Sequence, residues 1–72
     1  MREEIIEIVK KFASPNVNVH LNADIILDLA LDSLSMMQII SVIEEKYKIS
    51  MDYSKLMSIS TIGELINYIE SI

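Results

Sequence analysis

The chain has 72 residues, a formal net charge of −5 at pH 7 and no cysteine. This length allows one folded domain, which we expect to span residues 1–72. The acidic excess opposes binding to nucleic acid or to an anionic membrane surface, so basic partners are expected. Without cysteine the chain has no thiol chemistry of its own and few means of holding structural zinc. No apolar run reaches the roughly 18 residues of a membrane span, and we expect a cytoplasmic monomer without membrane insertion.

The composition favours an all-α fold. Hydrophobic residues make up 51% of the chain, whereas one glycine and one proline leave few turn markers for a protein of many short strands. Helices are also the simplest way to build an efficient core in a chain of this size. We therefore expect a small bundle of three main helices plus one short helix.

The first helix is predicted over residues 3–13. Its apolar residues recur at helical spacing and its charged residues lie on the other side. Ser14-Pro15-Asn16 ends it, because proline disfavours the helical conformation in the residue before it. A long connection follows, which could include a helical turn and must be buried in part; its apolar residues are Val17, Val19, Leu21, Ile25, Ile26, Leu27 and Leu29.

The second helix is predicted from Asp32 onward. Its core face is expected to hold Met36, Ile40, Ile43 and Tyr47. The opposite, exposed side is expected to hold Leu34, Gln38, Ser41 and Glu45. Leu34 is therefore an apolar residue on a polar face, and a lone exposed leucine usually has no functional meaning.

A second connection is predicted over residues 49–60, with a short helix around 53–57. Its expected anchors in the core are Tyr53, Leu56, Met57 and Ile59. The sequence Thr61-Ile62-Gly63-Glu64 fits the capping-box pattern, which predicts the start of the last helix. The buried stripe of that helix is expected to be Ile62, Leu65, Ile66 and Ile69.

Few residues suggest catalysis or metal binding. His20 is the only histidine, and a histidine in a polar loop stretch seldom has a chemical role. Asp24, Asp28 and Asp32 recur every four residues and do not form a calcium-binding loop pattern. Because no set of acid, base and nucleophile is apparent, we expect neither an enzyme nor a metal site.

Asp32-Ser33-Leu34, taken alone, is a helix N-cap. The residues around it suggest a function as well. Residues 22–34 resemble the segment that includes the modified serine of acyl carrier proteins; they read Asn-Ala-Asp-Ile-Ile-Leu-Asp-Leu-Ala-Leu-Asp-Ser-Leu. The resemblance continues through Ile43-Glu44-Glu45-Lys46-Tyr47 and residues 60–69, and so covers essentially the whole chain.

The resemblance implies that Ser33 carries a 4′-phosphopantetheine arm attached by a phosphopantetheinyl transferase. The thiol then comes with the cofactor. A helix start favours the new phosphodiester, because free amides and the helix dipole attract an anion. Asp32 matches the family's aspartate and either caps the helix or helps the transferase's metal ion to engage the site. The exposed face of the second helix would dock on loading and chain-modifying enzymes through their basic or apolar patches; its candidate docking residues are Leu34, Gln38, Ser41 and Glu45.

Departures from the family pattern leave the cargo open. Fatty-acid carriers usually have glycine at Ala30 and acidic residues at Ser35, at Gln38 and near Leu27. The resemblance implies a carrier of acyl thioesters for fatty-acid, polyketide or related biosynthesis, in which the helices could also shelter the acyl chain. The alternatives are a discrete peptidyl or aminoacyl carrier of a nonribosomal-peptide-type pathway, and an unmodified helical module that binds a partner through the Leu34 face.

Overall fold

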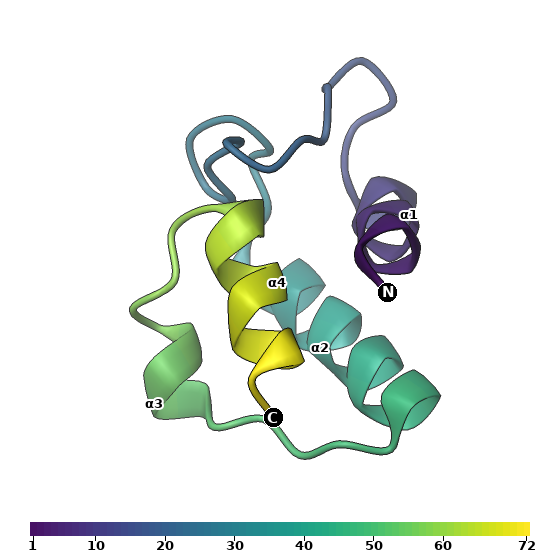
Figure 1. Ribbon diagram of the computed structural model, residues 1–72. Helices are drawn as coiled ribbons and strands as arrows, with labels where there is room; N and C mark the ends of the chain where they lie inside the picture. The colour runs from purple at the N-terminus through teal and green to yellow at the C-terminus, as the bar shows by residue number, and fades with distance from the viewer.

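The computed structural model describes residues 1–72 as four helices without a strand (Figure 1). The helices are α1 (Arg2–Phe12), α2 (Ser33–Tyr47), α3 (Tyr53–Leu56) and α4 (Ile62–Glu70). The predicted all-α bundle of three main helices and one short helix is confirmed. The capping box at the start of α4 is also present, because Thr61 accepts from the amide of Glu64 while the Glu64 carboxylate accepts from the amide of Thr61.

One apolar core holds the helices together. Sixteen residues are buried and all are hydrophobic; they come from the three long helices and the connections between them. On α2 the buried residues are Ile39, Ile40 and Ile43, whereas Met36 and Tyr47 are only half-buried. The prediction for α2 was wrong in omitting Ile39, because this helix packs against α1 as well as the rest of the core and its buried stripe is correspondingly wider.

Tyr47 is half-buried because its ring packs on the core while its hydroxyl reaches α1. The hydroxyl donates a hydrogen bond to Glu4 Oε1 at 3.0 Å, and Lys46 Nζ lies 3.3 Å from Glu4 Oε2. These two contacts hold the pKa of Glu4 below its usual range, the tyrosine bond being the larger cause. Burial, followed by the bond to Glu4, raises the pKa of Tyr47. The start of α1 is thereby tied to the end of α2.

Backbone hydrogen bonds fix the long connection between α1 and α2 against the start of α4. The Ile25 amide donates to the Ser60 carbonyl at 2.8 Å, and the Gly63 amide donates to the Leu21 carbonyl at 2.8 Å. A Cβ atom on residue 63 would lie 3.0 Å from the Leu21 oxygen, which is too close for most side chains. Gly63 therefore permits the approach of the two segments, and its place in the first turn of α4 keeps the cost to the helix small.

A left-handed residue turns the connection into α2. Ala30 has φ 53°, and its amide donates to the Ile26 carbonyl at 3.1 Å. An alanine in this region costs about 1 kcal/mol relative to glycine, because its Cβ crowds the neighbouring carbonyl. This is the position at which the family that the sequence resembles usually has glycine, so the turn keeps its shape here at the expense of some strain.

Candidate cofactor-attachment site

Ser33 is the first residue of α2, and its side chain is exposed. Asp32 precedes it in an extended conformation, with φ −91° and ψ 179°, and acts as the N-cap. The Asp32 carboxylate accepts from the Ser35 amide at 2.8 Å, and the Asp32 carbonyl accepts from the Met36 amide at 3.0 Å. The cap therefore places the Ser33 hydroxyl at a fixed point on the surface, on the rigid end of a helix of 15 residues.

The charge of Asp32 is part of this cap. Hydrogen bonds from the amide and then the side chain of Ser35 hold the pKa of Asp32 below its usual range. The carboxylate thus stays ionised at neutral pH and complements the positive end of the helix dipole. Asp32 therefore has the capping role, one of the two that the sequence allowed.

The surroundings of Ser33 fit a phosphodiester. The first turn of α2 contains no acidic side chain, so Asp32 is the one carboxylate in the cap and first turn of this helix. Helix N-terminal amides and the dipole stabilise an anion at this place. A serine hydroxyl that is exposed here is accessible to an enzyme that transfers a phosphate-containing group to it.

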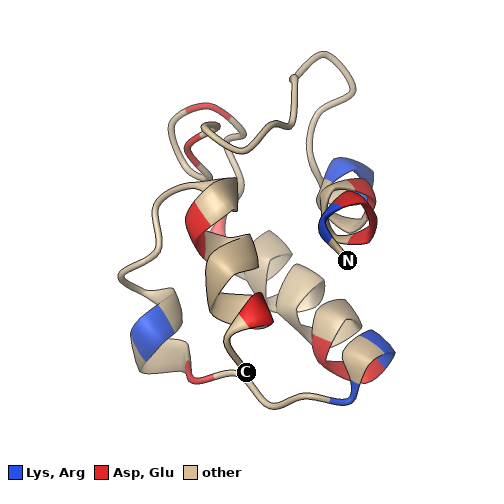
Figure 2. Ribbon diagram, viewed as in Figure 1, with Lys and Arg blue, Asp and Glu red and all other residues tan.

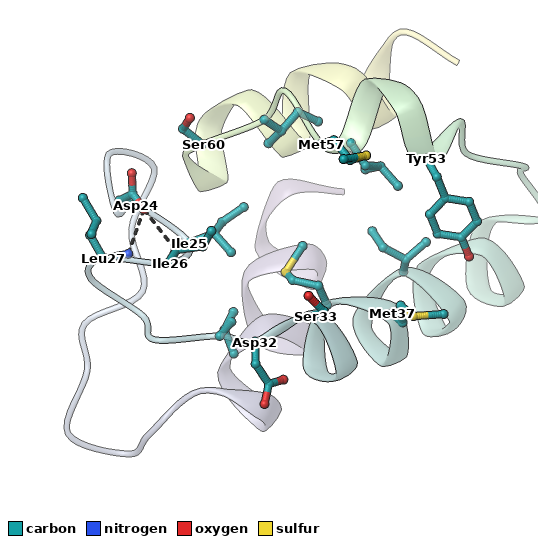
Figure 3. Close-up of a pocket in the computed structure, with 15 residues that line it drawn as sticks. Asp24, Ile25, Ile26, Leu27, Asp32, Ser33, Met37, Tyr53, Met57 and Ser60 are labelled. Carbon is teal, nitrogen blue, oxygen red and sulfur yellow. Dashed lines mark hydrogen bonds between the residues drawn. The ribbon is translucent and has the colours of Figure 1, made fainter.

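Ser33 also lines an apolar groove of about 660 Å³. The groove runs between α2, the connection before it, α3 and the segment leading to α4 (Figure 3). Of its 15 lining residues 11 are hydrophobic, and the more enclosed ones are Ile25, Leu31, Met36, Ile40, Leu56 and Ile59. A flexible group attached to Ser33 would therefore begin beside an apolar surface that can take up a hydrocarbon chain.

The rim of this groove corrects two expectations about the core. Tyr53 and Met57 were predicted as anchors, but they are 52% and 88% exposed. Leu27 in the opposite wall is 84% exposed. The prediction was wrong because α3 has four residues, a single turn, and only its Leu56 side faces the core. Apolar side chains therefore stand on both edges of the groove.

The four predicted docking residues of α2, which are Leu34, Gln38, Ser41 and Glu45, are all exposed. Sequence reasoning missed two further apolar residues beside them, Met37 and Val42, which are 55% and 40% exposed. The signal was present: both fall three or four residues from the predicted set and so on the same face of the helix. Whether this face docks on partners remains a prediction at this point.

The acidic residues before α2 hold a turn together. The Asp24 carboxylate accepts from the amides of Ile26 and Leu27 at 2.9 and 2.8 Å, and the Asp28 carboxylate accepts from the Asp24 amide at 2.8 Å. His20 accepts from the Asn22 amide at 3.2 Å through Nδ1. No cluster of three or more potential metal ligands is found in the structure. No helix is long and apolar enough to cross a membrane.

Comparison with known proteins agrees with this geometry. The family described as "Phosphopantetheine attachment site" matches residues 3–69. An acyl carrier protein of Thermotoga maritima is 34% identical over 74 residues, covering 96% of this chain and 91% of that protein. An acyl carrier protein of Cyanophora paradoxa is 42% identical over 50 residues, covering 67% of this chain and 48% of that protein. A solved structure from Mycobacterium tuberculosis, assigned as an acyl carrier protein, superposes with a TM-score of 0.88 at 21% identity, covering 97% of this chain and 95% of the other.

Fold and site together define a helical carrier with a serine at the start of its second helix. The chain belongs to the acyl carrier protein family, and its cofactor is a covalently attached phosphopantetheine. When bound, that cofactor supplies the thiol that this chain lacks. The family consists of carriers rather than catalysts, and its members work with phosphopantetheinyl transferases and biosynthetic enzymes.

Two substitutions at Asp32 separate its capping role from its charge. Asp32→Ala should lower the unfolding midpoint by about 5 °C, because the Ser35 amide loses its acceptor. Asp32→Asn should keep most of the stability, since asparagine caps as well as aspartate, yet it should slow attachment of the arm if the carboxylate also assists a metal ion. Thermal unfolding and the initial rate of loading, measured on both variants, test this. Full loading of Asp32→Asn at the wild-type rate would leave Asp32 with the cap alone.

Proposed function

We propose that residues 1–72 form one carrier domain whose Ser33 bears the 4′-phosphopantetheine arm. On that arm the protein would carry acyl intermediates as thioesters and present them to enzymes of fatty-acid, polyketide or related biosynthesis. The observation that carries this proposal is the exposed Ser33 hydroxyl at the capped start of α2. We propose further that the chain is not itself an enzyme and that it works as a monomer in the cytoplasm.

The groove beside Ser33 supports aliphatic cargo. The arm would start from the lining of an apolar groove of about 660 Å³, into which a hydrocarbon chain could fold back. Burying each methylene group contributes about 0.8 kcal/mol, so even a partly inserted chain would favour this position over water. An aminoacyl group, the alternative cargo, carries an ammonium that would lose its hydration in the same place.

Partner enzymes are proposed to dock on the exposed face of α2. Leu34 follows the attachment residue directly and is 66% exposed, so an enzyme that reaches Ser33 passes close to it. Gln38, Ser41 and Glu45 continue the same face toward the end of the helix. A partner bound along this face would hold the attachment point within reach of its active site.

Attachment at Ser33 is tested by mass. The purified chain is incubated with coenzyme A, magnesium and a broad-specificity phosphopantetheinyl transferase, and the intact protein is weighed. The wild type should gain one phosphopantetheine, whereas Ser33→Ala should gain none while retaining its helical content. The proposal fails if the wild type stays unmodified or if Ser33→Ala gains the same mass.

Docking through Leu34 predicts a kinetic effect without a structural one. Leu34→Asp should leave helical content unchanged, since the residue is exposed and an acidic side chain suits the first turn. It should lower kcat/KM for arm loading about tenfold or more, as expected for an apolar anchor at the centre of an interface. Asn67→Asp, on the exposed side of α4, serves as the matched control and should load normally. Equal rates for both variants would remove Leu34 from the interface.

The cargo preference is tested with loaded carriers. An octanoyl thioester should raise the unfolding midpoint above that of the acetyl form by roughly 5 °C, because its methylene groups enter the groove. Met36→Gln should reduce this difference, because Met36 lines the groove and is half-buried. An alanyl thioester should give no such gain. A midpoint independent of chain length would argue against shelter of the acyl chain.

A further inference from the structure

The exposed face of α2 is uncharged along most of its length. Residues 33–43 contain no acidic or basic side chain, although the chain as a whole carries a charge of −5. The charges of this helix are confined to Glu44, Glu45 and Lys46 at its far end, as Figure 2 shows. A partner that covers the region around Ser33 therefore meets no charged side chain on the first eleven residues of α2.

This uncharged part of α2 exposes three apolar side chains, with the polar Gln38 and Ser41 between Met37 and Val42. Leu34, Met37 and Val42 are 66%, 55% and 40% exposed, and we call them the α2 strip. Met37 lines the groove beside Ser33 and also a second, shallower hollow of about 380 Å³ that reaches Phe12 at the end of α1. The two hollows thus adjoin across Met37, and the apolar surface extends from the attachment site to α1. Contiguous apolar surfaces of this kind mark interaction sites more often than scattered residues do.

Asp32 and Lys10 near the α2 strip are engaged in contacts within the chain, whereas Lys11 beside Phe12 and Glu45 beyond Val42 are exposed and make no ion pair. The Asp32 carboxylate accepts the Ser35 amide at 2.8 Å, and Lys10 on α1 pairs with Glu7 at 3.6 Å. At physiological ionic strength the field of the remaining acidic residues is screened over about 8 Å. On residues 33–43 charge complementarity therefore has no side chain to act on, whereas burial of the strip contributes directly to binding.

We infer that the enzymes that handle this carrier dock on it through an apolar patch of low charge, which covers the α2 strip and the hollow beside Phe12. Association then depends on burial of apolar surface and not on pairing of acidic carrier residues with basic partner residues. The inference rests on the proposed function, because it specifies the chemistry of the partner surface that approaches Ser33.

A test with charges of both signs distinguishes the two modes of docking. Met37→Glu and Met37→Lys place opposite charges at the centre of the strip, and both residue types suit a helix. The probe is a broad-specificity phosphopantetheinyl transferase with coenzyme A, and kcat/KM for loading is measured for each variant. Docking by burial predicts that both variants slow loading by a similar factor of about ten, because either charge must be desolvated. Asn67→Glu and Asn67→Lys on α4 are the matched pair and should load at the wild-type rate.

The dependence on salt gives an independent readout. Between 50 and 500 mM salt, kcat/KM of the wild type should change by less than about threefold, because no charge pairs are screened. Opposite effects of the two Met37 variants, or a larger fall with salt, would overturn the inference. So would a dimer in size exclusion that Met37→Lys converts to a monomer, since a second copy would then cover the strip. A wild type that is not modified at all would instead defeat the proposed function.

Discussion

The hydrogen bonds between residues 21–25 and residues 60–63 are the constraint on which the site depends. The 20 residues that join α1 to α2 contain no helix, so no helical hydrogen bonds within this segment fix its conformation. Backbone bonds to the start of α4, two of them at 2.8 Å, give this connection a fixed place, and the close approach requires Gly63. Because the connection leads directly into the cap of α2, the same bonds fix the position of Ser33. They also hold the part of the connection that forms one wall of the groove, residues 24–27.

The acidic residues serve the structure more than the docking face. Asp32, Asp52 and Glu64 each accept backbone amides at a helix start. These bonds are the main cause that holds the pKa of Asp32 and Glu64 below the usual range, whereas for Asp52 the Ser54 hydroxyl is the larger cause and the Ser54 amide the next. A lowered pKa in the folded state means that the group stabilises the fold above its usual pKa. That contribution is lost as the pH falls through the lower value in the folded state. These three carboxylates therefore stabilise helix starts, whereas residues 33–43 of α2 contain no charged side chain.

The strain at Ala30 and the exposed groove rim both lie next to Ser33, the proposed attachment residue. The turn before α2 keeps a left-handed residue even without glycine, because the chain must redirect there to bring Asp32 onto the helix start. Leu27 and Met57 remain exposed on opposite edges of the groove, where burial in the core would have closed it. Apolar surface is thus retained next to Ser33 at some cost in stability.

The sequence by itself predicted the helices and the residue proposed for attachment. Periodic apolar residues predicted the helices. Pro15 predicted the end of α1, and the capping box at Thr61 the start of α4, each to within a residue. The resemblance around Ser33 to a known family predicted the cofactor. These are local signals, readable because a helix is held by contacts three and four residues apart. Only the tertiary structure decided that Met57 lines a groove instead of filling the core and that Met37 adjoins two hollows. Burial of such residues depends on which segments pack beside them, and contacts between residues distant in the sequence leave no periodic pattern in it.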